Sequence, residues 1–339
     1  MTLSMIERLH RLAAVWGPSG REQKIAASLA EAITPFVDEV RTDRFGNLIA
    51  TRRGGVGGRR IMVSAHMDSI GAIAMNVTEK GLILLEPVGG LKAWHAIGQR
   101  VVWGSGVVGV LQHDSVDDAK EVAFKKLWCD IGATSKAEAL ENVRLGDICT
   151  LVGELQQMGD DLLTGPGLDN RAGCAVLLEV AQHLESTPHE VVFVFPSQGK
   201  IGPRGAGTAA YGVDPDLAVV VDVCATGDTP RASRVEVKLG GGPALKLKDG
   251  NYMAHQRLSD MVRQIAEEQS IPLQTEIIAS PSGYTDAQVV SVAGQGIPTA
   301  VLNIPLRYRG TAAEMVNVRD MHGAADLVLK LLGSQFDLR

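Results

Sequence analysis

Three residues of metal-ligand type interrupt or end apolar stretches of the sequence. His66 follows a run typical of a buried strand, Asp169 follows a Gly-Pro-Gly turn, and Asp222 lies inside the apolar run Val219–Val223. One histidine and two carboxylates suit a divalent metal of hard to borderline character and leave a coordination position open for water. Asp68, two residues after His66, can fix the imidazole ring of a ligand histidine. These four residues together predict a metal site.

Each of these residues also has a purely structural interpretation. A lone histidine at a strand end is often only hydrogen-bonded, and Asp169 can be the N-cap of the helix that follows it, a contribution of about 1 kcal/mol. Asp222, inside an apolar strand, must be paired, ligating or protonated, because an isolated buried charge is costly. The combination of residues, rather than any one of them, favours a metal site.

The stretch from Val191 to Lys200 decides what such a site can do. It begins as a continuous run of β-branched and aromatic residues, which is typical of a strand covered on both faces. The run stops at Gln198, Gly199 and Lys200. In folds built on parallel strands, ligands collect at the carboxyl ends of the strands. These three residues are therefore expected to face the site together with His66.

Helical and strand patterns alternate along most of the chain, which predicts an α/β fold with a mostly parallel sheet flanked by helices. Apolar residues at helical spacing predict two N-terminal helices, and Ser19 with Glu22 forms a capping-box pattern at the second. Strands are expected at residues 37–41, 47–51, 60–65, 190–195, 217–223, 273–278 and 299–303, and further helices at 170–184, 205–211, 253–269, 286–293 and 320–332.

The pattern changes between residues 72 and 163, where short strands and many glycines replace the alternation. Strands are expected there at residues 71–77, 82–88 and 100–109. The segment predicts a small, β-barrel-like domain inserted into an α/β domain made of residues 1–71 and 164–339. Its strand edges favour pairing with a second chain, since an uncovered edge can accept another strand.

The composition excludes several kinds of partner. Apolar residues make up 45% of the chain and charged residues 21%, and the formal net charge of −6 offers no basic surface for nucleic acid. No apolar run reaches the roughly 18 residues that a membrane span needs. The four cysteines are widely spaced without a CxxC pair, as in reduced core thiols, and the N-terminus lacks a signal-peptide pattern. A cytoplasmic protein without nucleic-acid or membrane partners is therefore expected.

Five blocks of this sequence resemble, in the same order, the glutamyl and deblocking aminopeptidases, dinuclear zinc exopeptidases that include the tetrahedral aminopeptidases. The resemblance covers nearly the whole chain. It implies an α/β catalytic domain, a β-barrel-like dimerisation domain, a homo-oligomer from a dimer up to a dodecamer, and a peptide or small-molecule ligand in the cleft. The blocks are Ala65–Gly71, Leu168–Cys174, Val221–Val223 with Gly227–Pro230, Thr285–Ala287 and Pro305–Tyr308.

The resemblance implies a role for each residue in one half of the site. His66 and Asp222 would hold one metal, Asp169 would bridge two metals, and Asp68 would orient His66. That half is intact. The remaining titratable candidates are expected to be rim, structural or solvated groups: Glu314, His95, His113 and His322.

The other half of the site departs from the family. The family ends its central strand with Gln-Glu-Glu, of which the first Glu is the general base and the second a ligand of the other metal. Here Gln198 is followed by Gly199 and Lys200, and a ligand histidine of the family is replaced by Gly310. Loss of a general base lowers a reaction rate by about 10²–10⁴-fold. Peptidase activity is therefore expected to be lost or strongly reduced.

Two functions are compatible with this pattern. The chain can be a binding or assembly subunit, or act on an altered substrate, with Lys200 in place of the second metal. Alternatively, it is an active single-metal aminopeptidase that uses His66, Asp169 and Asp222. With Asp68 and a protonated Lys200, these carboxylates carry a formal charge of −2, which one divalent metal would neutralise. The expected cofactor is one divalent metal, zinc or cobalt, or none.

Overall fold

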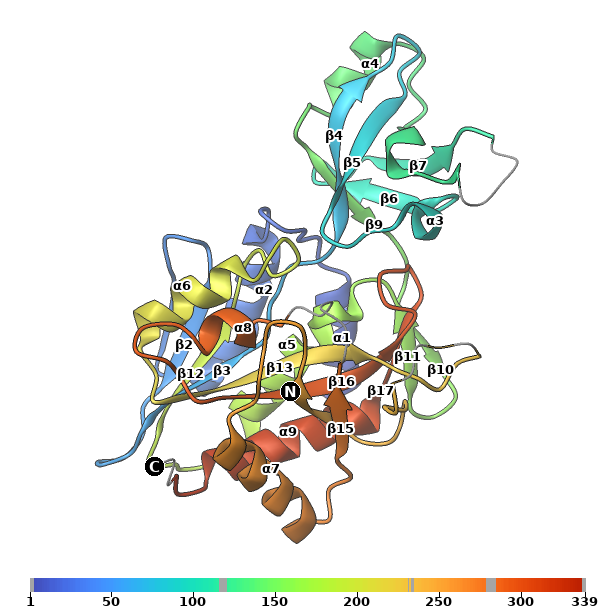
Figure 1. Ribbon diagram of the computed structural model, residues 1–339. Coiled ribbons are helices and arrows are strands. Elements are labelled where there is room, and N and C mark those ends of the chain that lie inside the picture. Colours follow the sequence, from blue (N-terminus) through green and yellow to red (C-terminus); the bar gives the residue numbers. More distant parts are fainter. Residues whose placement is uncertain (1–2, 116–120, 231, 233–234, 279–284, 337–339) are drawn as a thin grey trace.

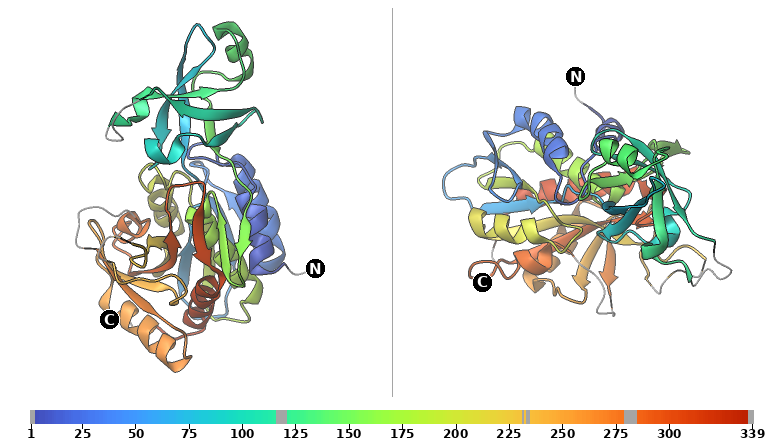
Figure 2. Two further views of the ribbon diagram at one scale, coloured as in Figure 1. Left: turned by 90° about the vertical axis from the view of Figure 1, so that its right-hand side faces the viewer. Right: turned by 90° about the horizontal axis from the view of Figure 1, so that it is seen from above.

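The chain folds into two lobes, a large α/β body and a smaller β barrel that stands on one end of it (Figure 1). The structure is a computed structural model that describes residues 3–115, 121–230, 232, 235–278 and 285–336. Two further views show helices on both faces of the large sheet (Figure 2). The predicted α/β fold with a small β-barrel-like unit is confirmed.

One mixed sheet of eleven strands, counted over the described residues, forms the body. In spatial order its main path is β1 (Glu39–Thr42), β2 (Leu48–Arg52), β12 (Glu190–Phe195), β3 (Arg60–Ser64), β13 (Leu217–Ala225), β16 (Thr299–Arg307), β17 (Glu314–Asn317), β11 (Leu162–Gly165) and β10 (Gln156–Met158), with β14 (Ala244–Lys248) and β15 (Gln274–Ile277) beside β16. The centre, from β12 to β16, is parallel. Antiparallel strands extend it on both sides, and the strands β14 and β15 form a further parallel pair, so the sheet is mixed with a parallel centre.

The parallel registers bring the predicted site residues to one edge of the sheet. Ser64 of β3 pairs with Val194 of β12 on one side and with Val220 of β13 on the other. The segments that follow β3 and β12, and the end of β13, therefore leave the sheet at the same level. This is the edge at which ligands collect in sheets with parallel strands.

Alternate residues of the central strands face two different apolar cores. Val191 and Phe193 contribute to the largest core, whereas Val192 and Val194 contribute to a second core on the opposite face. Burial on both faces explains why β12 reads as a continuous apolar run rather than as an alternating one.

Helices supply the outer walls of both cores. The larger core lies under α1 (Met5–Ala13), α2 (Gln23–Ile33), α5 (Leu168–His183), α7 (Gln256–Glu268) and α9 (Val318–Leu332), and the smaller core under α6 (Arg204–Val213) and α8 (Ala287–Val290). Two short 3₁₀ helices, Thr34–Phe36 and Phe124–Lys126, complete the assignment. Within the described ranges, none of the helices is both long enough and apolar enough to cross a membrane.

The capping box predicted at Ser19 and Glu22 is wrong. The helix α2 begins at Gln23, and the side chain of Glu22 makes no capping hydrogen bond. The capping box of this region is at α1 instead, where Ser4 N donates to Glu7 Oε2 at 2.8 Å and Ser4 Oγ accepts from Glu7 N at 3.3 Å. The side chains of Ser19 and Glu22 instead form hydrogen bonds at the candidate active site.

The smaller lobe is a closed barrel with its own apolar core. The sequence predicts one strand at residues 100–109, but a turn divides this stretch into two strands. The strand β10 lies inside the predicted insertion of residues 72–163 and β11 crosses its end, yet both pair in the large sheet. The division of the chain at residues 72 and 163 stays a prediction. The barrel contains, in spatial order, β4 (Gly71–Val77), β5 (Ile83–Val88), β8 (Leu127–Asp130), β7 (Val108–His113), β6 (Arg100–Trp103) and β9 (Ile148–Leu151), with the helices α3 (Ala93–Ala96) and α4 (Lys136–Asn142).

The cysteines are core residues, as the sequence predicts. All four are free and buried. Burial raises the pKa of the Cys129 thiol and that of the Cys174 thiol to about 12 each. Both thiols are therefore protonated at neutral pH, and they lack the thiolate form that reacts with electrophiles and metals.

Candidate active site

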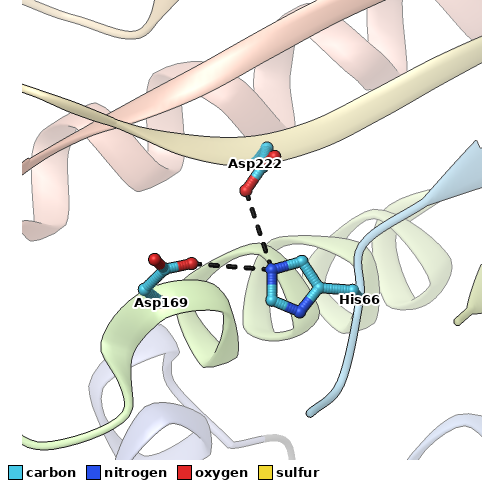
Figure 3. A group of neighbouring side chains, drawn as sticks. All are labelled: His66, Asp169 and Asp222. Atoms are coloured by element: carbon cyan, nitrogen blue, oxygen red, sulfur yellow. Dashed lines mark ion pairs between the residues drawn. The ribbon is translucent and has the colours of Figure 1, made fainter. Parts of the chain in front are cut away.

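Three of the predicted site residues converge beyond the carboxyl end of the central strands (Figure 3). His66 follows β3, Asp169 lies at the start of α5, and Asp222 stands in β13. His66 Nε2 lies 3.5 Å from Asp169 Oδ1 and 3.9 Å from Asp222 Oδ1, and all three side chains are buried. The ligand atoms of a tetrahedral zinc ion are about 3.3 Å apart, given bond lengths of about 2.0 Å. All three ligand atoms lie within 4.8 Å of one another, so the group would have to contract by up to about 1.5 Å to hold one such ion.

Asp68 anchors the His66 ring and the end of the central strand at the same time. Its Oδ1 accepts a hydrogen bond from His66 Nδ1 at 3.1 Å and one from Gly199 N at 2.8 Å. Its Oδ2 accepts from Lys200 N at 2.8 Å and from the Ser19 hydroxyl. Burial raises the pKa of Asp68, but these donors outweigh burial and bring the pKa to about 2. The ionised carboxylate holds the Nδ1–H of His66, which leaves Nε2 available to a metal.

Glu22, which was predicted to cap α2, supports the turn after β12 instead. Its carboxylate accepts hydrogen bonds from Gly20 N at 2.7 Å and from Gln198 N at 2.9 Å. Gln198 has a φ of +56°, a left-handed conformation that is uncommon for residues other than glycine. The turn that carries Lys200 is thus held by Glu22 on one side and by Asp68 on the other.

Two cations of the chain hold the carboxylate of Asp169. The ammonium group of Lys200 forms an ion pair with Oδ1, and Arg309 Nε donates to Oδ2 at 2.6 Å. Burial raises the pKa of Asp169, but Arg309 and Lys200 outweigh burial and hold the pKa well below its usual range. The Lys200 side chain is 8% exposed and that of Arg309 is 43% exposed. Asp169 is therefore neutralised by an interior lysine and by an arginine nearer to solvent.

Glu314, which was expected to be a rim residue, is buried. Its Oε2 accepts from Asp169 N at 3.1 Å, and its Oε1 accepts from Gly310 N at 2.8 Å. Burial and the charge of Asp169 raise the pKa of Glu314 to about 7. Glu314 therefore links the backbone of Asp169 to the loop that carries Arg309, and so fixes the distance between the two members of this ion pair.

Gly199, at the position of the expected general base, lies too close to its neighbours to carry a side chain. A Cβ atom on Gly199 would be 2.6 Å from His66 Cγ and 2.9 Å from Asp68 Oδ1. Carbon atoms in contact are normally about 3.5–4.0 Å apart. A glutamate at position 199 would therefore displace the imidazole ring of His66 or the turn after β12.

Gly310, at the position of the expected ligand histidine, differs from Gly199 in this respect. A Cβ atom there would have no heavy atom closer than 3.8 Å, but the residue has a φ of +78°, which favours glycine. The carbonyl of Gly310 lies 3.1 Å from His95 Nδ1, so this barrel histidine packs against the loop. Within the described residues, His95, His113 and His322 do not join the metal-ligand group, as expected.

The sequence profile of a family described as M42 glutamyl aminopeptidase matches residues 46–327. This chain belongs to the M42 glutamyl aminopeptidase family. A protein of Acetivibrio thermocellus is 38% identical to it over 329 residues, which cover 97% of this chain and 98% of that relative. The family resemblance inferred from the five sequence blocks is confirmed.

Solved aminopeptidase structures share the fold of this M42 chain. Aminopeptidase APDkam598 from Desulfurococcus kamchatkensis superimposes with a TM-score of 0.93 at 32% identity, covering 97% of this chain and 94% of that one. The TET1 peptidase of Pyrococcus horikoshii has a TM-score of 0.86 at 30% identity, covering 98% and 100%. That TET1 peptidase can assemble into a tetrahedron or a large octahedral shell.

The M42 site of this chain has one half that fits a metal ion and one half that does not. The types, burial and spacing of His66, Asp169 and Asp222 suit one divalent ion. Lys200 forms an ion pair with Asp169 Oδ1, which is also the oxygen 3.5 Å from His66 Nε2, and Arg309 pairs with Oδ2. Neither cation has a lone pair to offer a metal while it is protonated.

A proton occupies the histidine of the metal group when no metal is bound. Burial and Lys200 lower the pKa of His66, but Asp169 and Asp68 act in the opposite direction and bring it to about 10. A metal that binds Nε2 must therefore displace a proton at neutral pH, which weakens its apparent affinity.

Arg309 is the site residue that the sequence reasoning missed. It raises the formal charge of the group formed with Asp68, Asp169, Asp222 and Lys200 from −2, the sequence count without it, to −1. A bound divalent ion would then leave a net charge of +1 instead of zero. The signal that could have revealed Arg309 is its place between the Arg-Tyr pair of the fifth block and Gly310.

Proposed function

We propose that this M42 protein has lost its peptidase activity, or retains very little, and serves as a binding or assembly subunit or acts on an altered substrate. The observation that carries the proposal is the pairing of both oxygens of Asp169 with protein cations, Lys200 and Arg309. Two-metal hydrolases use their ions to stabilise the attacking and the leaving oxygen together. With protein cations at Asp169, that arrangement cannot form.

The missing general base supports the same proposal. Gly199 has no side chain, and the surrounding atoms leave no space for one. Glu314, a buried carboxyl near Asp169, accepts a backbone hydrogen bond on each of its two oxygens and is held between Asp169 and Gly310. Loss of the base alone is expected to lower the rate by about 10²–10⁴-fold.

For the metal, we propose an occupancy of at most one ion per chain, zinc or cobalt, held by His66, Asp169 and Asp222 and supported by Asp68. An ion bound there would supply Lewis-acid chemistry to a ligand in the cleft. Lys200 then takes the place of a second ion by neutralising the carboxylate that such an ion would share. The ligand of the cleft is proposed to be a peptide or another small molecule.

Metal analysis and activity assays on the same preparation test this proposal. Protein purified without chelator should contain no more than one equivalent of metal by plasma emission spectroscopy. It should release at most traces of N-terminal residues from short peptides with added zinc, cobalt or manganese. Two equivalents of metal, or a turnover number in the ordinary enzyme range of about 1–10³ s⁻¹, would contradict it.

A second candidate function is an active single-metal aminopeptidase. It is favoured by the spacing of the His66, Asp169 and Asp222 ligand atoms, which lie within 4.8 Å of one another. In that case hydrolysis should require the added metal, and Asp222→Asn should abolish it. An activity that survives Asp222→Asn would point to a contaminating peptidase rather than to this site.

We further propose that the chain forms a homo-oligomer, from a dimer up to a dodecamer, in the cytoplasm. Support comes from the assembly of the TET1 peptidase and from apolar side chains that the barrel exposes, since Met75 is 56%, Val108 54% and Val110 42% exposed. Assembly needs none of the replaced site residues. Light scattering at micromolar concentration should show a mass above that of the 36.0 kDa monomer, and a monomer alone would refute this proposal.

A further inference from the structure

A pocket of about 260 Å³ lies where the α/β body meets the barrel, beside the metal-ligand group but outside it. Its wall includes the apolar side chains of Ile70, Val102, Leu151 and Pro166. An engineered cavity of about 150 Å³ is large enough to bind benzene. The pocket therefore has room for a small organic molecule with a branched aliphatic or aromatic part.

Arg171, on the first turns of α5, contributes the charge that this pocket contains. Its side chain is 2% exposed, and Nη2 reaches only the carbonyl oxygens of Val15 and Gly17, each at 3.4 Å. Within the described residues, Nη1 has no hydrogen-bond partner, and no carboxylate lies within ion-pairing distance of the guanidinium. An arginine guanidinium carries its positive charge at neutral pH. The carboxylates of Asp68 and Glu22 act on the guanidinium only from beyond ion-pairing distance, and a buried charge without a direct partner is rare.

The indole N–H of Trp16 is a second hydrogen-bond donor of the same pocket. Trp16 lines the pocket, and its indole Nε1 is buried without an acceptor among the residues that the structure describes. Buried donors in folded proteins are nearly always paired, with protein or with an ordered molecule. The pocket thus combines an apolar wall, a positive charge without a direct ion pair and two unused N–H donors.

We infer that this pocket binds a small organic carboxylate. The guanidinium of Arg171 presents a planar set of donors that matches a carboxylate, and the indole N–H of Trp16 is a further donor to it. The aliphatic part of the ligand packs against Ile70, Val102 and Leu151. Water could satisfy the two donors but would not form an ion pair with Arg171. The site is independent of the function proposed for the metal-ligand group.

The same chemistry can come from a free carboxylic acid or from the carboxyl end of a peptide. We therefore use 4-methylpentanoate as a free acid, N-acetyl-leucine as a mimic of a peptide end, and 4-methylpentanamide as the neutral analogue of the first. Binding to the full-length protein is measured by calorimetry and by the shift in thermal unfolding temperature. At least one of the two carboxylates should bind at least tenfold more tightly than the amide, and the better one identifies the source.

Variants then place the binding in this pocket. Val102→Phe adds volume to the pocket wall, and Val292→Phe makes the same change at a side chain that is 73% exposed and does not line the pocket. Val102→Phe should weaken carboxylate binding at least tenfold, and Val292→Phe should leave it unchanged. Arg171→Gln should remove the preference for the acid over the amide. If that variant does not fold, the comparison of the two Val→Phe variants decides alone.

Three outcomes would overturn the inference. The first is that neither carboxylate binds. The second is that the amide binds as tightly as the acid, which would mean that the charge of Arg171 plays no part. The third is that Val102→Phe binds the carboxylate with the same affinity as the unmodified protein, which would place the binding elsewhere.

Discussion

Gly199 is the residue at which the departure from the family can be tested most directly. In Gly199→Ala, the new Cβ atom would lie 2.6 Å from His66 Cγ, 2.7 Å from His66 Cβ and 2.9 Å from Asp68 Oδ1. The first two atoms belong to a side chain that Asp68 holds in place, so they cannot simply rotate away. Overpacking of this kind costs about 1–3 kcal/mol. The variant should be destabilised by that amount, and its metal affinity should fall about 10–100-fold, as for other losses of support around a ligand.

Gly212→Ala provides the matched control for this prediction. Gly212 lies in α6, and a Cβ atom there would have no heavy atom within 4 Å. The same substitution in a helix interior should stabilise the protein by about 0.5–1 kcal/mol. Urea unfolding followed by fluorescence gives the stability of both variants, and competition with a zinc-binding dye gives their metal affinity. A Gly199→Ala protein as stable as the control, with unchanged affinity, would refute the contact argument.

The close approach of Gly199 to His66 also limits any attempt to restore activity. The sequence comparison predicts that Gly199→Glu, Lys200→Glu and Gly310→His would all be needed, because members of a catalytic unit do not act additively. The structure adds that the glutamate at position 199 lacks space beside His66. The triple variant should therefore bind metal poorly and remain inactive unless the turn after β12 moves.

Two further predictions concern charged residues and their effect on stability. In the presence of chelator, Lys200→Met should lower the free energy of unfolding by about 3–5 kcal/mol, because it leaves the buried Asp169 with one cation fewer. Arg309→Met should lower it by less, because that side chain is 43% exposed. Urea unfolding of the two variants measures both losses, and the reverse order would contradict this prediction. Burial raises the pKa of Asp320 to about 6, so its contribution to stability is present below about pH 4 and is lost as the pH rises to about 6, by up to about 3 kcal/mol. Asp320→Asn should flatten this part of the stability curve, and an unchanged curve would refute the assignment.

The sequence predicted the elements whose local pattern is strong. The strand β12 was predicted at residues 190–195, where the structure has it, because both of its faces are buried and Pro196 ends the run. The short strands β11 and β17 were missed. Each has four residues, and they pair with each other across about half of the chain, so neither carries a pattern that stands out from its surroundings.

The contacts of the site were harder to predict because they join distant segments. Ser19 and Glu22 fit a capping box by spacing, yet Ser19 donates to Asp68, 49 residues away, and Glu22 accepts from Gln198, 176 residues away. Arg309 meets Asp169 across 140 residues. The resemblance identified the positions at which this chain differs from the family. It did not indicate which nearby cation would take the place of the missing ligands beside Asp169. Lys200 was identified because it replaces a ligand directly, whereas Arg309 lies one residue before such a position.

The two cations on Asp169 also make the fold independent of metal supply. A carboxylate that only a metal neutralises becomes a buried, unpaired charge when the metal is removed. Here Lys200 and Arg309 provide the counter-charge as part of the polypeptide. The chain can therefore fold to its native state without a bound metal. The amount of folded protein in the cell should then depend on its rate of synthesis and not on the available zinc. A chelator-treated protein that no longer unfolds in a cooperative transition would show that the cations do not serve this purpose.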